Sequence, residues 1–346
     1  MADGSHRPAR RARFWQESLH SVVLCGPAVV IYGGFMVLPA VLGFGYSFTD
    51  WNGWARKANF IGLANFAELF RDKQLLAAVK FTLFETVLLV LFFTFASMAL
   101  AVLLDKIRMM KGLIRSLFFY PYILSMLVAA LAFVYMANYR EGAVNVIVRA
   151  VGENGAVLGV LSWLRGCFEF LGSGSWAPGW LGSACAWMAS HVCDPATWPQ
   201  DWMGDAALVP YFIFALMAWS CLGFFTMIYL ANLQTIPEYL YEAADIDGAG
   251  PWSVFTKIQF PMLLPTVTTN SVLALITGIN LFGQILVTTE GGPGYRTFTV
   301  GYYIYSLGIL KNRQGYATAV SVVMFVALVV IAFIQVSLLR RKEVQA

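Results

Sequence analysis

The sequence predicts an all-α membrane protein with six membrane-spanning helices. Of its 346 residues, 59% are hydrophobic and only 12% are charged, which is too apolar for a soluble chain of this length. The charged residues cluster and leave six long uncharged runs, and a helix that crosses a bilayer needs about 20 mostly apolar residues. The spans are expected at about residues 22–48, 80–104, 115–137, 207–233, 262–289 and 315–339.

The distribution of Lys and Arg predicts the orientation of these spans, because basic residues near span ends are retained on the cytoplasmic side. They are concentrated in the tail of residues 1–21, in the turn 105–115 and directly after the last span, at Arg340, Arg341 and Lys342. Both termini, including a short tail at 343–346, are therefore expected in the cytoplasm. The first apolar stretch is much longer than a signal-peptide core and is interpreted as a retained helix.

A long loop, residues 137–206, is expected on the outside. Its two apolar pieces, 143–151 and 157–163, are too short to span, and frequent Gly and Pro favour a compact loop or small cap. Its tryptophans suit the membrane interface better than a ligand pocket. Cys185 and Cys193 are either free thiols, joined in a disulfide or part of a metal site, although their spacing matches no strong metal signature.

Several chemistries have no support in the sequence. No GxxxxGK[ST] loop is present and none of the lysines follows a glycine, so this chain is not expected to bind ATP by itself. The HExxH and GxSxG motifs are also absent, and the basic residues form no stripe for nucleic acid. We therefore expect no catalytic residue, no metal and no cofactor of its own. Glu85, the one acid in the second apolar run, is interpreted as a hydrated residue near the outer boundary.

The inside loop, residues 234–262, carries the strongest local signals. Thr235 and Glu238 have the spacing of a capping box, which predicts the start of a helix. Gly248 is expected to end that helix, because glycine adopts a positive φ at little cost. Gly250 and Pro251 suit the cap and first turn of a second short helix, before Pro261 leads into the membrane.

The same loop resembles the EAA loop of ATP-binding-cassette importer permeases, whose pattern is EAAxxDGAxxxxxFxxIxLP. The match runs from Glu242 to Pro261 and departs only at Phe260, where leucine is usual. Further segments are similar to the permeases of carbohydrate importers related to the maltose and glycerol-phosphate systems: WSCLGFFTMIYLANLQTIP (219–237), TEGGPGYRT (289–297) and GYA (315–317). The resemblance implies the type I importer permease fold and transport of a sugar, an oligosaccharide or a glycerol-phosphate-like solute.

The resemblance also implies partners. These are a second related permease, two copies of an ATPase that would bind ATP and Mg²⁺, and an extracytoplasmic solute-binding protein, in a bacterial or archaeal cytoplasmic membrane. The short helices would seat in the ATPase as a rigid knob, so that ATP-driven closure moves the spans. The residues assigned to this coupling are Glu242, Ala243, Ala244, Asp247, Gly248 and Ala249.

Solute recognition is predicted from neutral polar and aromatic side chains in the spans. Asn280 and Gln284 are the preferred candidates, because four residues apart they share one face of a helix. Further candidates for the path are Trp219, Asn270, Tyr302 and Tyr305. Two departures weaken the inference of a solute: Phe282-Gly283 stands where many members have Phe-Asp, and some twenty extra residues follow Trp180-Leu-Gly182.

Two alternative functions remain open. An ion-gradient-driven secondary transporter would work without ATPase subunits and should show inverted repeats, which we do not detect. A membrane-anchored enzyme or assembly subunit would use the Trp-rich outer loop and would tolerate loss of residues 242–248. The companions that co-purify with the chain would separate the three functions.

Overall fold

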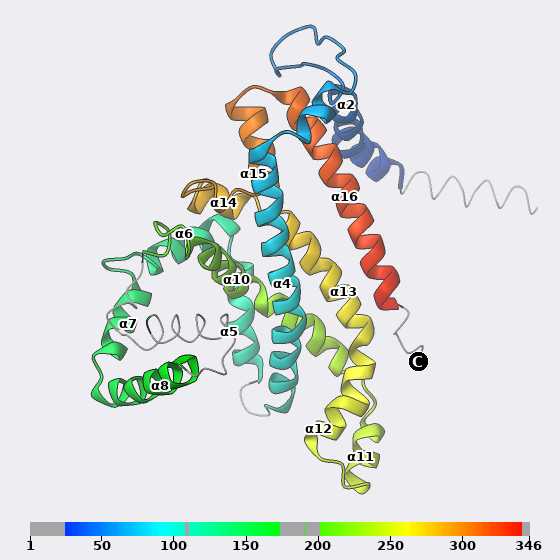
Figure 1. Cartoon of the computed structure of the whole chain (residues 1–346). Coiled ribbons are helices and arrows are strands. Elements are labelled where there is room, and N and C mark those ends of the chain that lie inside the picture. The colour runs from blue at the N-terminus through cyan, green and yellow to red at the C-terminus, as the bar shows by residue number, and fades with distance from the viewer. Residues whose placement is uncertain (1–24, 108–110, 174–189, 191–200, 341–346) are drawn as a thin grey trace, which may run out of the picture. The chain divides into compact units, whose positions relative to one another are not determined.

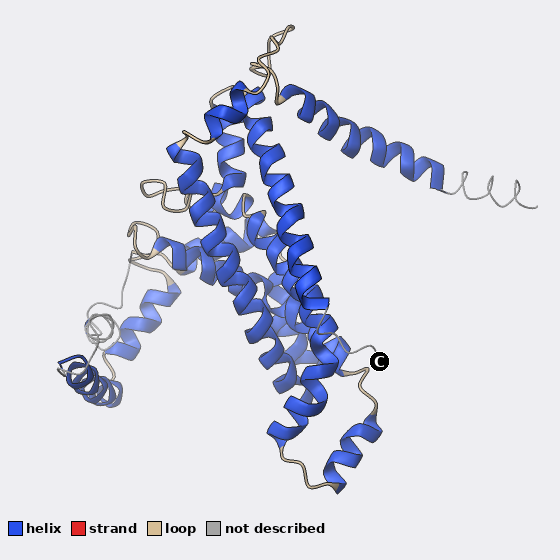
Figure 2. Ribbon diagram, turned by 45° about the vertical axis from the view of Figure 1, so that its right-hand side comes forward, coloured by secondary structure: helices blue, strands red, loops and turns tan. Residues whose placement is uncertain are grey.

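The computed structural model describes residues 25–107, 111–173, 190 and 201–340. In this part of the chain every regular element is a helix, and the remainder is loop (Figure 2). The chain divides into two compact units. Unit 1 combines Met1–Asp72 with Ile304–Val326, and unit 2 combines Lys73–Tyr303 with Ala327–Ala346.

Within the described residues, five helices are long and apolar enough to cross a membrane, or six if one bent pair counts as a single span. The first covers Cys25–Tyr46 and includes a π-helical turn, η1 (Gly33–Val37), followed by α2 (Leu38–Tyr46). Its large apolar side chains, such as Phe35 and Met36, are exposed. Exposure of this kind suits a helix surrounded by lipid, where apolar surface costs nothing.

Unit 2 is built around α4 (Lys73–Lys106), which packs against α10 (Val209–Leu233) and α13 (Phe260–Ile279) (Figure 1). Phe93 of α4 and Phe225 of α10 stack with ring centroids 4.3 Å apart in the middle of this core. A second apolar cluster lies nearer the ends of the same helices and contains Met98, Ala101, Tyr229, Leu230, Leu233, Ile236 and Leu263.

The third predicted span is bent instead of straight. α5 (Lys111–Ile123) and α6 (Met126–Met136) meet at an angle of 100°. Pro121 lies inside α5, where it removes one backbone donor, and Ser125 is extended with ψ 134°. The span predicted over 115–137 therefore corresponds to a bent pair of helices, because an uncharged run records length and polarity but not a bend.

The fifth predicted span is also different. Helical structure begins earlier, at α12 (Pro251–Val254), and continues through η3 (Phe255–Gln259) into α13. The wide π turn precedes Pro261, whose ring would crowd the carbonyl of Lys257 in a regular α-helix. The helix then stops at Ile279, and a separate helix, α14 (Gly283–Thr288), follows three residues later. The span predicted over 262–289 therefore corresponds to a candidate span over Pro251–Ile279, which is followed by the separate helix α14.

The outer segment contains two helices, α7 (Ala143–Gly152) and α8 (Gly155–Ser173). α8 is longer than the apolar piece predicted at 157–163, because Arg165 and Glu169 pair at 2.9 Å one turn apart on its exposed surface. Cys185 and Cys193 lie outside the described residues, so the possible disulfide stays a prediction. The remaining helices are α3 (Ala64–Leu69), α11 (Glu238–Ile246), α15 (Val300–Tyr305), η4 (Ser306–Leu310) and α16 (Gln314–Arg340).

Candidate functional site: the two-helix loop and the polar residues of the helices

The loop of residues 234–262 folds as two short helices joined by a tight turn (Figure 1). α11 ends at Ile246 with Asp247 as its C-cap, and Gly248 follows with φ +70°. α12 then starts at Pro251 behind an extended Gly250 cap. The predicted positive φ at Gly248 and the predicted start of the second helix are both confirmed.

The start of α11 is stabilised differently from the prediction. Its N-cap is Pro237, and no side chain caps the helix. Thr235, predicted to begin a capping box, instead donates its hydroxyl to the carbonyl of Asn232 at 2.8 Å, just past the end of α10. The capping box is wrong because the preceding helix offers its unpaired carbonyls to Thr235 first.

The exposed side of this loop carries both acids and large apolar side chains. Tyr239 and Ile246 of α11 are 65% and 86% exposed, and Trp252 of α12 is 74% exposed. Tyr239, Ala243 and Ile246 share one exposed face of α11, at spacings of four and three residues. We call this surface, with Glu242 beside it, the knob face. An exposed apolar stripe on a two-helix projection is typical of a docking surface.

Of the six predicted coupling residues, Glu242, Ala243, Asp247 and Gly248 are exposed and Ala249 is half-buried. Ala244 differs, because its side chain is only 8% exposed and packs inside the chain itself. The expectation that Ala244 lets a partner approach is therefore wrong. Its small side chain allows the loop to close, and its carbonyl accepts the backbone N–H of Ala249 at 2.9 Å.

The other side of the loop is fixed to the helices. Leu240 and Tyr241 pack on the cluster formed by α4, α10 and α13. The Tyr241 hydroxyl also accepts a hydrogen bond from the buried Gln259 amide at 3.4 Å. Loop and helices thus form one packed body, which can transmit a rigid motion. Sequence reasoning missed Tyr241 and Gln259, although Leu240 and Tyr241 alternate with the exposed residues at helical spacing.

The break between α13 and α14 separates two of the residues predicted to line the solute path. Asn280 and Gln284 do not share a helix face, because Asn280 caps the end of α13 and Gln284 belongs to α14. Asn280 is exposed and Gln284 is half-buried. The loop after the break is held by Thr299, whose hydroxyl donates to the carbonyl of Leu281 at 2.6 Å. The two amides therefore flank an interruption in the helix.

The other candidates for the path occupy packed positions. Asn270 is fully buried and donates its side-chain amide to the carbonyl of Phe225 at 3.1 Å, which joins α13 to α10. Trp219 is half-buried and its ring lies 5.9 Å from that of Phe133. Tyr302 is buried against Phe298, and Tyr305 is half-buried. These contacts thus pack parts of the chain against one another.

Glu85 is not hydrated in this structure. It lies about three turns into α4, is fully buried, and neither carboxylate oxygen has a hydrogen-bond partner among the described residues. The neighbouring Thr86 hydroxyl is also unpaired and buried, and the backbone of Gly278 in α13 approaches it closely. The prediction failed because α4 starts at Lys73, earlier than the uncharged run suggests.

Among the residues that the structure describes, no three His, Cys, Asp or Glu side chains are grouped as metal ligands would be. The candidates in this part of the chain are therefore the two-helix loop and the separate polar side chains of the helices.

Comparisons with known proteins agree with this picture. The family model described as "Binding-protein-dependent transport system inner membrane component" matches residues 75–344. The multiple sugar-binding transport system permease protein MsmF of Streptococcus mutans is 28% identical over 90% of this chain and 91% of its own. The sn-glycerol-3-phosphate transport system permease protein UgpA of Agrobacterium fabrum is 27% identical, over 90% and 92%.

Among solved structures, a chain of the bacterial alginate ABC transporter in complex with alginate pentasaccharide-bound periplasmic protein superimposes with a TM-score of 0.69. It is 21% identical, and the match covers 95% of this chain and 96% of that one. This likeness establishes the fold.

Proposed function

The chain belongs to the family of inner membrane components of binding-protein-dependent transport systems, and from this we propose how it couples transport to ATP hydrolysis. The knob face is the observation that carries the proposal. It presents an apolar stripe and the exposed Glu242 on a projection that is packed rigidly against α4, α10 and α13. A partner that moves this projection would move the helices behind it.

We infer that the partner is a separate ATPase subunit, present in two copies, and that ATP and Mg²⁺ bind there. A second permease of the same family would complete the translocation path, and a solute-binding protein would deliver the solute from outside. The exposed acids of α11, namely Glu238, Glu242, Asp245 and Asp247, favour a groove in the ATPase that contains basic residues. The proposed orientation places both chain termini in the cytoplasm, on the side of the knob face.

The proposed solute is a sugar or a related polyhydroxylated compound. The names of the relatives MsmF and UgpA refer to sugars and to glycerol 3-phosphate, and neutral amide side chains are suited to hydroxyl groups. The break between α13 and α14 is the preferred part of the path, because interrupted helices commonly line solute sites in transporters. Asn280 and Gln284, on its two sides, would contact the solute. Replacing both with leucine should reduce uptake in cells while the complex still assembles.

The coupling proposal is tested by Gly248→Asp, with Gly250→Asp as a matched control. Gly248 has φ +70°, so a side chain there is strained and the turn below the knob face shifts. Gly250 has φ −70° and caps α12, a position where aspartate is favourable. We expect Gly248→Asp to lose most ATPase association and coupled ATP hydrolysis in the purified complex, and Gly250→Asp to retain both.

A second pair of variants separates docking from folding. Ala243→Trp adds bulk to the exposed knob face and should block association without unfolding the loop, because Ala243 contacts solvent. Ala244→Trp must overpack the interior of the loop and should lower the thermal stability of the chain as well. Full ATPase stoichiometry in both Gly248→Asp and Ala243→Trp complexes would remove the basis of the proposal.

A further inference from the structure

A pocket of about 220 Å³ lies in unit 1, between the segment that follows the first apolar helix and the start of α16. Its polar and aromatic wall comprises Asp50, Trp51, Asn65, Glu68, Asn312, Arg313 and Tyr316. The first helix ends at Tyr46 and α16 begins at Gln314, so the pocket adjoins the ends of two candidate spans. Such ends mark the boundary between hydrocarbon and headgroups.

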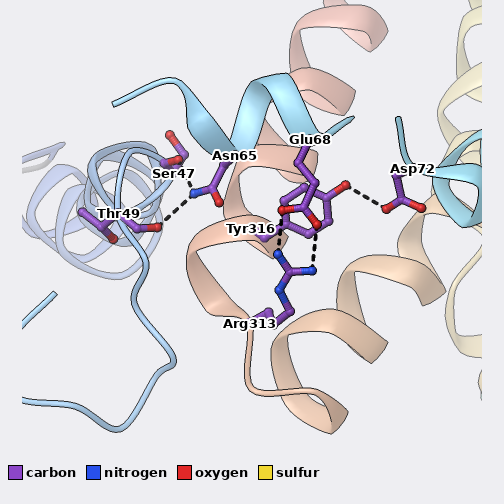
Figure 3. Close-up of polar contacts among 7 residues, drawn as sticks. All are labelled: Ser47, Thr49, Asn65, Glu68, Asp72, Arg313 and Tyr316. Atoms are coloured by element: carbon purple, nitrogen blue, oxygen red, sulfur yellow. Dashed lines mark hydrogen bonds and ion pairs between the residues drawn. The ribbon is translucent and has the colours of Figure 1, made fainter. Parts of the chain in front are cut away.

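Apart from the amide of Asn312, the main side-chain hydrogen-bond donors of this wall are already engaged with the chain. The Arg313 guanidinium donates to both carboxylate oxygens of Glu68, at 2.9 and 2.7 Å. The Asn65 amide nitrogen donates to the backbone carbonyls of Ser47 and Thr49, at 2.9 Å each (Figure 3). The Trp51 indole N–H donates to the carbonyl of Ala55 at 3.0 Å. A ligand that brings only acceptors finds few donors here.

Acceptors, in contrast, remain available. Asn65 is only 5% exposed, and its side-chain oxygen points away from the two carbonyls, with no hydrogen bond from the part of the chain described (Figure 3). The Asp50 carboxylate accepts two hydrogen bonds from Asn59, at 2.8 and 2.9 Å, which leaves about half of its lone-pair directions open. These hydrogen bonds from the Asn59 side chain and backbone also hold the pKa of Asp50 below its usual value.

The charge and the aromatic surface point to the same class of ligand. Two carboxylates, those of Asp50 and Glu68, face one guanidinium, so the wall carries one negative charge in excess. One side of the Trp51 ring stacks on Tyr46, with centroids 4.2 Å apart, and the indole also lines the pocket. Tryptophan is the aromatic side chain that attracts cations most strongly. A small cation rich in N–H donors satisfies each of these features.

We propose that this pocket binds a primary ammonium group, supplied by the headgroup of phosphatidylethanolamine in the surrounding bilayer. The ammonium would donate to Asp50 and to the Asn65 oxygen and lie against Trp51. A lipid is favoured over a soluble amine because the pocket adjoins the ends of two apolar helices. The exposed Trp54 and Phe70 nearby also suit the headgroup region.

The test uses the intact transport complex in nanodiscs that contain equal amounts of phosphatidylethanolamine and phosphatidylglycerol. The complex is released from the nanodiscs, and the lipids that it retains are identified by native mass spectrometry. Asp50→Asn removes the charge and should reduce retained phosphatidylethanolamine by up to about fivefold, as for one exposed ion pair. Asp201→Asn is the matched control, because Asp201 is also exposed and accepts a local backbone hydrogen bond, from Gly204. Trp51→Leu is the second variant and should act in the same direction as Asp50→Asn.

Two further measurements test whether the bound group is an ammonium with N–H donors and whether it comes from a lipid or from a soluble amine. Phosphatidylcholine, whose quaternary ammonium has no N–H, should be retained less than phosphatidylethanolamine, and this difference should vanish in Asp50→Asn. Displacement of the lipid by free ethanolamine would support the ammonium site and assign it to a soluble amine. Equal retention of phosphatidylethanolamine and phosphatidylglycerol, or no effect of Asp50→Asn and Trp51→Leu, overturns the proposal. It is also overturned if Asp50→Asn releases the solute-binding protein instead of a lipid.

Discussion

An acid of unit 1, Glu68, and an acid of unit 2, Glu85, lie in opposite situations. In unit 1 the charged groups of Glu68 and Arg313 are half-exposed and paired with each other, and the buried Tyr316 hydroxyl donates to Asp72 at 2.8 Å (Figure 3). In unit 2 the acid Glu85 is fully buried and unpaired. Paired, solvated charges contribute little to stability, whereas an unpaired buried carboxyl is costly.

This difference separates polar residues that support the structure from those that need another explanation. A buried polar group without a partner is rare in folded proteins and usually has a functional reason. An intramembrane acid is a functional candidate for the same reason. We therefore expect the pairs of unit 1 to make small contributions to stability, and transport to depend on Glu85.

The largest effect is expected from Glu85→Leu. Leucine has a similar volume and removes two unsatisfied oxygens, so the free energy of unfolding should rise by about 1–3 kcal/mol. Uptake by cells should fall nevertheless, because stability gained at a functional position commonly costs activity. Thermal unfolding of the purified complex and uptake of labelled solute measure the two effects.

Glu85→Gln is the control for this experiment. The amide keeps the size and the polarity, so the buried position stays unsatisfied and the gain in stability should be absent. If Glu85→Leu raises stability and leaves uptake unchanged, Glu85 has no role in transport, and the contrast between the two units concerns packing alone.

The local features of the fold were accessible from the sequence, and the features that depend on distant contacts were not. The positive φ of Gly248 follows from glycine placed after a predicted helix, and both its neighbours lie within the same short segment. Helices over Val209–Leu233 and Gln314–Arg340 follow similarly from uninterrupted apolar runs.

The breaks at Ser125 and Asn280 arise from contacts that no local pattern records. Gly283, directly after the second break, lies so close to Met126 that a side chain would clash. The hydroxyl of Thr299 holds the carbonyl of Leu281 from 18 positions away. For the same reason the sequence could indicate which residues carry the coupling function but could not show that Ala244 points inward, since that depends on how α11 packs on the helices.

The second effect, in order of size, is expected in unit 1 from Tyr316→Phe. The ring stays, and only the hydrogen bond to the Asp72 carboxylate is lost. Hydrogen bonds to charged groups contribute about 1.5–3 kcal/mol, and partial exposure of the pair should place the loss near the lower limit. Urea unfolding of the complex in detergent would measure it. An unchanged midpoint would show that water replaces the hydroxyl and that the network of unit 1 adds nothing.

A smaller effect is expected from Asn270→Leu in unit 2. This change removes the hydrogen bond between α13 and the carbonyl of Phe225, but it also removes an unsatisfied side-chain oxygen. Hydrogen bonds between membrane helices average about 0.6 kcal/mol, so the two consequences should nearly cancel. Uptake should be retained, because Asn270 is buried between helices. If the variant loses uptake while its stability is normal, Asn270 contributes to the solute path.

A small effect is also expected from the ion pair of unit 1, measured by a double-mutant cycle of Glu68→Gln and Arg313→Gln. Both side chains are nearly half exposed, at 44% and 46%, so solvent and salt screen their attraction. The coupling energy should be about 0.5–1 kcal/mol at low salt, because the geometry is bidentate, and should decrease as ionic strength rises. Arg313 also lies 4.6 Å from the centre of the Tyr316 ring. The single variant Arg313→Gln loses this contact as well, but its contribution cancels in the double-mutant cycle. A coupling energy above 2 kcal/mol that is insensitive to salt would mean that the pair is shielded from water in the assembled complex. The contrast between the solvated ion pair of unit 1 and the buried Glu85 of unit 2 would then apply only to the isolated chain.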